Sequence, residues 1–184
     1  EPYYRGRRTC QLARRIGFEQ VTHLLWFGSI PDAGAFAFPA DRPEDGLAGV
    51  YAAMAAGALP LERLRGVAPF AAATDPMRHD LSPRSVSASA GRLIAGLVGA
   101  MPLVGGACSP VALLHRRLWA RLTPLPPEPA LLAALDATLV LVADHDLGAP
   151  STAAARLAAS VGGDIYSVVS VGLNSSGGVV QAAS

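Results

Sequence analysis

The 184-residue chain is poor in cysteine, charge and aromatic side chains, and it contains no lysine. Charged residues make up 16% of it and aromatic residues 6%, whereas hydrophobic residues make up 51%. This balance excludes a disordered tail and predicts a packed core built from Leu, Val and Ala. The formal net charge of +1 predicts no strongly charged partner, so we expect no binding to nucleic acid.

The small number of cysteines and the shortness of the hydrophobic runs indicate the cellular location of the chain. Cys10 and Cys108 form no paired framework, so we expect reduced thiols in a cytoplasmic protein. The longest hydrophobic run, residues 93–108, is interrupted by Pro102 and falls short of the roughly 20 apolar residues that span a bilayer, so no membrane segment is expected. Residues 1–5 do not resemble a signal peptide, and because residue 1 is not Met we expect a fragment or a processed chain.

The signatures of common catalytic sites are absent as well. The sequence has no His-Glu-x-x-His or paired-cysteine motif, no phosphate-binding glycine loop and no Gly-x-Ser-x-Gly elbow. We therefore expect no metal site and no bound cofactor. The glycine pairs at 105–106 and 177–178 are interpreted as closely packed or flexible backbone. His23, His79 and His115 have no ligand-type residues at metal-binding spacing, and they are interpreted as packed or solvated imidazoles.

Helical spacing and helix start signals predict an all-α fold, organised as a single helical domain over residues 1–184. No stretch shows sustained β alternation. Helices are expected over 9–16, 18–27 and 47–56, from Pro60 onward, from Pro83 to Pro102, from Pro110 to Arg121, and over 130–143, 151–161 and 164–173. Ser82 and Ser109 each precede a proline and predict an N-cap, and Ser151 and Asp164 are further candidate caps. The Pro- and Gly-rich stretches 31–46 and 123–129 are expected to be loops.

One stretch is dense in polar chemistry, "VADHDLGAPSTAAARLAAS" from Val142 to Ser160. There Asp144, His145 and Asp146 follow a hydrophobic run. An imidazole flanked by two carboxylates holds its proton more tightly and can donate it to an anionic substrate oxygen. A polar turn between two helices explains the same residues, so on these residues alone both interpretations stay open.

Two segments resemble the citrate synthase family. "YRGRRTCQLARRIGFEQVTHLLWFGSIPD", from Tyr4 to Asp32, is similar to the family's N-terminal pattern, in which Tyr-Arg-Gly precedes one helix and Phe-Glu-x-Val lies in the next. "VADHDLGAPSTAAARLAASVGGDIYSVVSVGL", residues 142–173, is similar in order and spacing to the family's Ala-Asp-His-Glu, Ala-Ser-Thr and Asp-x-Tyr elements. Residues 33–127 resemble the family only in their helical pattern.

The resemblance implies a multi-helical fold in which residues 1–184 form the N-terminal part of a citrate synthase-like large domain. It implies condensation of acetyl-CoA, or a related acyl-CoA, with oxaloacetate, acetyl-CoA being a substrate rather than a cofactor. It also implies a dimer, either a homodimer or a heterodimer with a second citrate synthase-like chain. Within this frame His145 is implied to bind oxaloacetate.

The sequence departs from the family at one catalytic position. The family's Gly-Pro-Leu-His-Gly-Gly segment carries the His that stabilises the thioester enolate, and counting on from His145 places Gln181 of "GGVVQAAS" there. A shift of one residue would place Val180 there instead. A Gln amide can donate a hydrogen bond to an enolate oxygen but cannot exchange a proton as imidazole does. Losing one such donor typically costs about 10²–10³ in rate. The remaining catalytic residues would lie beyond Ser184.

Three hypotheses follow for the function. The chain is a citrate synthase-like acyltransferase, present here as a fragment or as one part of a split protein. Alternatively it is a non-catalytic partner or regulatory subunit of that family, or a helical domain with an unrelated role. The Asp144–Asp146 stretch favours ligand binding, while Gln181 favours lost or altered chemistry.

Overall fold

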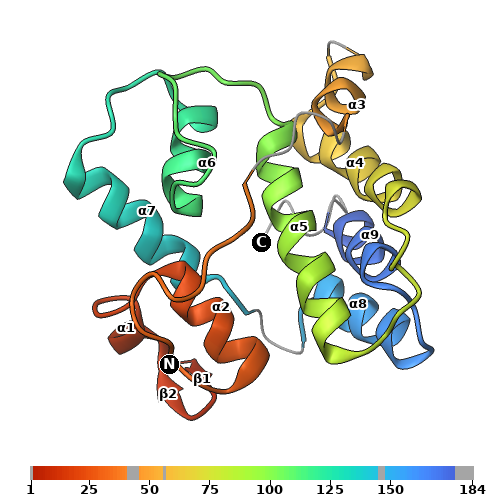
Figure 1. The fold of residues 1–184 in the computed structure, drawn as a ribbon, viewed down its shortest axis with the longest axis horizontal. Helices are drawn as coiled ribbons and strands as arrows, with labels where there is room; N and C mark the ends of the chain where they lie inside the picture. Colours follow the sequence, from red (N-terminus) through yellow and green to blue (C-terminus); the bar gives the residue numbers. More distant parts are fainter. Residues whose placement is uncertain (1, 41–45, 56, 145–147, 177–184) are drawn as a thin grey trace. The chain divides into compact units, whose positions relative to one another are not determined.

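The structure, a computed structural model, is helical and describes residues 2–40, 46–55, 57–144 and 148–176 (Figure 1). The prediction of an all-α fold is confirmed. The chain separates into two compact units, of which unit 1 comprises residues 1–40 and 102–145 and unit 2 comprises residues 41–101 and 146–184. The organisation of residues 1–184 as a single domain stays a prediction.

Unit 1 combines an N-terminal hairpin with helices from two separate stretches of the chain. Its elements are β1 (Tyr3–Tyr4), β2 (Arg7–Arg8), α1 (Thr9–Leu12), α2 (Phe18–Phe27), α6 (Leu114–Leu122) and α7 (Pro129–Leu141). Side chains from the hairpin, α1, α2 and α7 form its core, namely Tyr4, Leu12, Val21, Leu24 and Val140. The Phe-Glu-x-Val segment thus lies in α2, as the sequence predicts.

The hairpin was not expected from the sequence. Arg5 and Gly6 have φ angles of 49° and 76°, so both central residues of the turn are left-handed, as a two-residue hairpin turn requires. Tyr4 pairs with Arg7 in the antiparallel register. Because side chains alternate along a strand, Tyr4 points inward and is 2% exposed, whereas Tyr3 is 60% exposed. The turn therefore buries the tyrosine of the Tyr-Arg-Gly segment.

Unit 2 is built from helices alone among its described residues. They are α3 (Leu47–Ala53), α4 (Pro60–Thr74), α5 (Pro83–Ala100), α8 (Pro150–Ser160) and α9 (Ile165–Ser175). The core residues come from α3, α4, α5 and α9, namely Leu47, Tyr51, Val67, Ala68, Ala71, Leu93, Ala100 and Tyr166. Helix α8 contributes no buried residue and packs along α9.

Two predicted N-caps are confirmed by hydrogen bonds. The Ser82 hydroxyl accepts from the Ser85 N–H at 3.3 Å, with Pro83 as the first residue of α5. The Asp164 carboxylate accepts from the N–H groups of Tyr166 and Ser167, each at 3.0 Å, and so caps α9. In both cases a local side chain satisfies N–H groups that have no partner within the helix.

The predicted helix start at Ser109-Pro110 is wrong. Ser109 lies in a turn, where its carbonyl accepts from the Ala112 N–H at 3.0 Å. Helix α6 begins at Leu114 instead, because the Glu19 carboxylate of α2 accepts the Leu114 N–H at 2.7 Å. A residue 95 positions away therefore sets this helix start, and the local Ser-Pro pattern does not.

Other boundaries also differ from the predictions, since α3 ends at Ala53 instead of residue 56 and α7 at Leu141 instead of residue 143. Helix α1 ends at Leu12 and not at Ile16, because the chain continues in a turn whose Arg15 and Ile16 N–H groups both donate to the Leu12 carbonyl. Ser151 is not a cap, since Pro150 takes the first position of α8 and Ala149 becomes its N-cap without a side-chain hydrogen bond. Proline at this position fixes the helical φ angle by itself.

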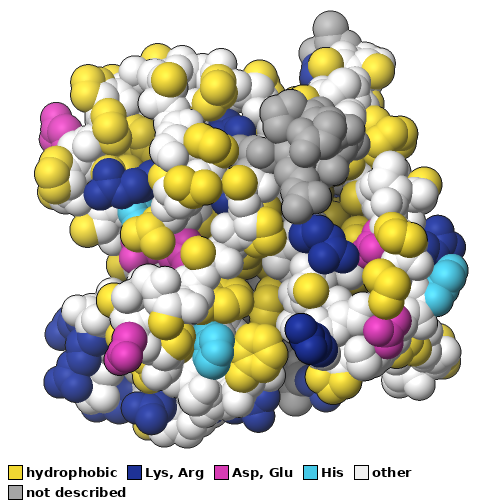
Figure 2. Space-filling model, in the orientation of Figure 1, with side chains coloured by type: hydrophobic (Ala, Val, Ile, Leu, Met, Phe, Trp, Pro, Cys, Tyr) yellow, Lys and Arg dark blue, Asp and Glu magenta, His cyan; other side chains and the backbone are white. Residues whose placement is uncertain are grey.

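Hydrophobic side chains are common on the face of each unit seen in Figure 2. Large hydrophobic side chains that are exposed in the described part of the chain include Leu59, Val111, Leu157 and Val161. Within the described residues no helix has both the length and the hydrophobicity needed to cross a membrane.

Candidate functional site

The C-terminal end of α7 is held by a tyrosine from the N-terminal hairpin. The Tyr4 hydroxyl donates to the Leu141 carbonyl at 2.9 Å, and the Asp144 N–H donates to the Tyr4 oxygen at 3.2 Å. Tyr4 and Asp144 are 140 residues apart in the sequence. The structure therefore joins the two segments that carry the family resemblance, Tyr-Arg-Gly and Ala-Asp-His. We call residues 142–144, which His145 follows in the sequence, the α7 corner.

The environment of Tyr4 keeps its hydroxyl group protonated. Burial raises the pKa of Tyr4 above its ordinary value, although the hydrogen bond from the Asp144 backbone acts in the opposite direction. At neutral pH the phenol therefore remains a donor to the Leu141 carbonyl. Next to it, the Arg5 guanidinium donates to the Leu25 carbonyl at 2.8 Å and ties the hairpin turn to α2.

The two residues to which the sequence assigns roles lie outside the described residues. His145, the predicted oxaloacetate ligand, directly follows the Asp144 backbone that Tyr4 binds. Gln181, at the position of the family's enolate-stabilising His, is in the segment 177–184. Asp146 is also outside the described part of the chain. Their roles stay predictions.

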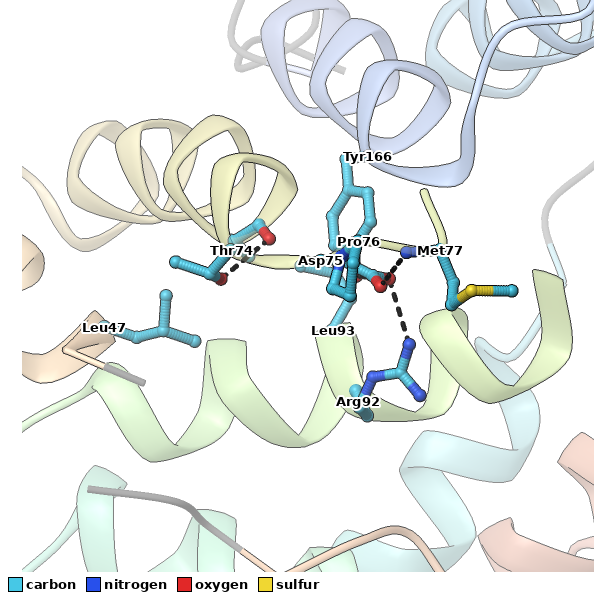
Figure 3. Close-up of a pocket in the computed structure, with 9 residues that line it drawn as sticks. Leu47, Thr74, Asp75, Pro76, Met77, Arg92, Leu93 and Tyr166 are labelled. Carbon is cyan, nitrogen blue, oxygen red and sulfur yellow. Dashed lines mark hydrogen bonds and ion pairs between the residues drawn. The ribbon is translucent and has the colours of Figure 1, made fainter. Parts of the chain in front are cut away.

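A second polar site lies in unit 2, at the residue that follows α4. Three donors converge on Oδ2 of Asp75: the hydroxyl of Tyr166 at 2.6 Å, the hydroxyl of Ser89 at 2.7 Å and the guanidinium of Arg92 at 2.9 Å. Oδ1 accepts the Met77 N–H at 2.9 Å. Figure 3 shows Tyr166 reaching Asp75 from α9 and Arg92 reaching it from α5. We call this the Asp75 cluster.

The protonation states within the Asp75 cluster follow from these contacts. Burial by itself would raise the pKa of Asp75, but the hydrogen bonds from Tyr166, Ser89 and the Met77 N–H outweigh it and hold this pKa well below its usual range. Burial, together with the hydrogen bond to Asp75, raises the pKa of Tyr166 to about 12. At neutral pH the cluster is therefore a carboxylate surrounded by protonated donors.

A cavity of about 340 Å³ adjoins the Asp75 cluster. It is lined by Leu47, Ala71, Thr74, Asp75, Pro76, Met77, Arg92, Leu93 and Tyr166 (Figure 3). A carboxylate with a strongly lowered pKa and four donors is a poor general base at neutral pH. The hydrogen bonds of the cluster therefore join α5 and α9 to the residue that follows α4.

Sequence reasoning missed the Asp75 cluster. Residues 75–80 predict a turn, and the turn is present, since Asp75 accepts the Met77 N–H. Nothing in the sequence spacing links Asp75 to Tyr166, which lies 91 residues further on. The only available signal was that Tyr166 belongs to the Asp-x-Tyr element of the family resemblance.

Two of the histidines behave as predicted. His23 Nδ1 lies 2.8 Å from the Ser29 carbonyl, and its ring packs against Phe27 and Phe36. His79 is exposed and accepts from the Arg78 side chain at 2.9 Å. The interpretation of these two as packed or solvated imidazoles is confirmed.

His115 is different, because the fold brings ligand-type side chains to it. It is buried in unit 1 and lies beside Glu19 and Asp136. Within the described residues this is the group whose ligand atoms are close enough together to hold a metal ion. Its three members come from α2, α6 and α7, which is why no metal-binding spacing is visible in the sequence.

Gly105, the first glycine of the pair 105–106, is closely packed, which is one of the two interpretations given for this pair from the sequence. A Cβ atom at Gly105 would lie 2.6 Å from the Thr123 carbonyl oxygen. The Gly105 N–H donates to the Ala120 carbonyl at 2.9 Å. At Gly106 a Cβ atom would meet no atom within 4 Å. The glycine at 105 is thus required for packing against the end of α6, not for phosphate binding.

Comparison with known proteins decides the family. The family model described as "Citrate synthase, C-terminal domain" matches residues 1–182. The chain belongs to the citrate synthase family. A 2-methylcitrate synthase of Mycobacterium tuberculosis is 28% identical over 178 residues, which cover 90% of this chain and 45% of that protein. A citrate synthase of Mycolicibacterium smegmatis is 28% identical over 195 residues, which cover 92% of this chain and 48% of that protein.

Solved citrate synthases share the fold. The crystal structure of citrate synthase from Pyrobaculum aerophilum matches 97% of this chain and 50% of that chain, with a TM-score of 0.67 and 21% identity. That from Thermotoga maritima matches 98% and 50%, with a TM-score of 0.65 and 19% identity. The predicted citrate synthase-like fold is confirmed. The chain spans about half the length of the citrate synthase relatives that it matches, and its place within a large domain stays a prediction.

Proposed function

We propose that this chain takes part in the condensation of an acyl-CoA with oxaloacetate, and that the α7 corner contributes to the oxaloacetate site. Membership of the citrate synthase family supports the reaction type. The observation that carries the proposal is the contact of Tyr4 with Leu141 and Asp144, because it holds the backbone beside His145 with a buried, protonated phenol.

The proposed chemistry divides between binding and enolisation. Oxaloacetate carries two carboxylates, and an imidazole next to acidic side chains donates a hydrogen bond to such an anion. This is the role proposed for His145. The α-proton of a thioester is only weakly acidic, so a base must remove it while a donor stabilises the enolate oxygen. Gln181 would supply the donor hydrogen bond without exchanging a proton.

The names of two relatives indicate which acyl-CoA substrates to consider for this chain. One relative is a 2-methylcitrate synthase and the other a citrate synthase. A product with one methyl group more than citrate requires an acyl-CoA one carbon longer than acetyl-CoA. We therefore propose acetyl-CoA or this longer homologue as the thioester substrate.

Release of free CoA tests the catalytic proposal. The purified chain is incubated with acetyl-CoA or with propionyl-CoA, with and without oxaloacetate, and the CoA thiol is measured by its reaction with a disulfide reagent. We expect slow thiol release that depends on oxaloacetate, because Gln181 cannot exchange a proton as an imidazole does. Because imidazole both donates and exchanges a proton, Gln181→His should raise the rate by up to about 10²-fold. If neither the folded wild-type chain nor the folded Gln181→His variant releases thiol, the proposal that this chain is catalytic is rejected.

A second function, that of a non-catalytic partner subunit, is favoured by one surface. Helix α8 has no buried residue: its Leu157 is 68% exposed, and Val161, the residue that follows the helix, is 79% exposed. Large exposed hydrophobic side chains on one helix are typical of protein-binding faces. We propose that this face contacts a second citrate synthase-like chain, either an identical copy or a longer family member.

The molecular mass in solution tests the partner proposal. Light scattering behind gel filtration should give a dimer for the wild-type chain and a smaller mass for Leu157→Glu, whereas Leu59→Glu, on another exposed hydrophobic residue of unit 2, should leave the mass unchanged. A wild-type monomer that also fails to bind a longer citrate synthase of the same cell would reject this function.

A further inference from the structure

Three ligand-type side chains from three helices of unit 1 meet at one buried point. Glu19 lies on α2, His115 on α6 and Asp136 on α7, and their ligand atoms all lie within 4.8 Å of one another. Glu19 is 5% and His115 6% exposed. The sequence predicts no metal site, because α2 ends at Phe27, far from α6, which begins at Leu114, and from α7, which begins at Pro129.

Backbone N–H groups hold both carboxylates in place. Oε1 of Glu19 accepts the Leu114 N–H at 2.7 Å at the start of α6, and Oδ1 of Asp136 accepts the Phe18 N–H at 3.0 Å at the start of α2. Hydrogen bonds of this kind orient carboxylates that ligate metals. The two oxygens of a carboxylate together offer about four lone-pair sites, so each of these carboxylates can accept its N–H and still ligate a cation.

The imidazole of His115 supplies the observation that points to a ligand. Its side chain is only 8% exposed, yet Nδ1 makes no hydrogen bond with any residue in the described part of the chain. A buried polar atom without a partner is costly. Nδ1 nevertheless lies 3.3 Å from Oδ1 of Asp136. Two ligands of a tetrahedral ion, each about 2.0–2.1 Å from it, are separated by about this distance.

The charge of the cluster also suits a divalent cation. The ligand oxygens of Glu19 and Asp136 lie within 4.8 Å of each other, and two carboxylates this close repel each other unless a positive charge lies near them. A set of one imidazole nitrogen and two carboxylate oxygens is typical of zinc and its first-row neighbours.

We propose that Glu19, His115 and Asp136 bind one divalent transition-metal ion, for which zinc is the best-fitting choice. The ion ties α2, α6 and α7 together inside unit 1, so its role is structural. This site is separate from the α7 corner and does not depend on the proposed condensation. It replaces the expectation from the sequence that the chain has no metal site.

Zinc retention by the wild-type chain is the first test. Tag-free chain is stripped with a chelator, incubated with zinc chloride, passed through gel filtration and analysed for bound metal by mass spectrometry. We expect about one zinc ion per chain and a thermal unfolding midpoint that rises with zinc concentration, since a ligand that binds only the folded state stabilises it. No retained zinc and no change in the midpoint would overturn the proposal.

Variants locate the ion. Glu19→Gln keeps an amide oxygen that can accept the Leu114 N–H, so it preserves the helix cap while removing the charged ligand. We expect Glu19→Gln and His115→Gln to bind zinc at least about 10-fold more weakly, with no zinc-dependent rise in the midpoint. His79→Gln, at an exposed histidine of unit 2, should bind as the wild type does. Equal retention by the wild type and by Glu19→Gln would place the metal elsewhere and overturn the assignment. If a variant fails to fold, the number of zinc ions bound per wild-type chain and the zinc dependence of the wild-type unfolding midpoint still test whether the chain binds zinc.

Discussion

At the scale of single residues, contacts between distant side chains decide which groups are charged. Asp75 is a buried carboxylate because Tyr166, Ser89 and Arg92 donate to it. Arg92 is 40% exposed, so its ion pair adds little, and the two hydroxyl donors matter more. Tyr166 is 3% exposed and belongs to the core of unit 2. Because the Tyr166 hydroxyl donates to Asp75, the protonation of Tyr166 is coupled to the packing of its ring in the core of unit 2.

Alkaline unfolding tests the state of Tyr166. A tyrosine whose pKa is raised from 10.0 to about 12 stabilises the folded state fully below pH 10, and this stabilisation is lost as the pH rises toward 12. The loss should be on the order of 2 kcal/mol. Denaturant unfolding measured between pH 8 and pH 12 should therefore show this loss in the wild type.

Two phenylalanine variants assign that loss. Tyr166→Phe lowers stability at pH 8, because the hydrogen bond to Asp75 is gone, but its stability should fall less steeply above pH 10. Tyr3→Phe, at a tyrosine that is 60% exposed, should follow the wild type throughout. Parallel curves for the wild type and Tyr166→Phe would show that Tyr166 does not carry the effect.

At the scale of helices and turns, the sequence predicts what local chemistry controls. Helix α2 runs from Phe18 to Phe27 as predicted, because its hydrophobic face and its flanking glycines are local features. Ser82 and Asp164 cap their helices as predicted, for the same reason. The start of α6 could not be predicted, since the Glu19 carboxylate of another helix defines it.

Tyr4→Phe tests how the hairpin holds the end of α7. The variant keeps the ring in the core but leaves the Leu141 carbonyl without its donor, so we expect a loss of about 1 kcal/mol in the free energy of unfolding. Oxaloacetate should also bind less tightly, because the backbone beside His145 is released. Tyr3→Phe, the exposed neighbour, is the matched control for both measurements. Unchanged stability and affinity in Tyr4→Phe would contradict the role given to this contact.

Adjacent glycines give a second test at this scale. In Gly105→Ala the new methyl group would lie 2.6 Å from the Thr123 carbonyl oxygen, so the segment must move away from α6. We expect a cost of about 1–3 kcal/mol in urea unfolding. Gly106→Ala meets no atom within 4 Å and should be close to neutral. Equal effects at both positions would show that packing against α6 is not what Gly105 provides.

At the scale of the whole molecule, the sequence predicted the family and the helical fold but not the sites inside it. The Ala-Asp-His and Tyr-Arg-Gly segments are local patterns; the family that they indicate is confirmed by the family model, and the helical fold by the solved citrate synthases. The Asp75 cluster joins α5 and α9 to the residue that follows α4, and the group around His115 joins three helices, so neither could be predicted from sequence spacing.

The chain covers about half of its citrate synthase relatives, so binding by this chain has to be measured directly. The decisive measurement is a calorimetric titration of oxaloacetate into the wild-type chain and into His145→Ala, with His23→Ala as the control at a histidine on α2. We expect saturable binding by the wild type and by His23→Ala, and at least about 10-fold weaker binding by His145→Ala, the cost of about one charge-assisted hydrogen bond. No saturable binding by the folded wild-type chain, or equal affinity in all three proteins, would contradict an oxaloacetate site at the α7 corner.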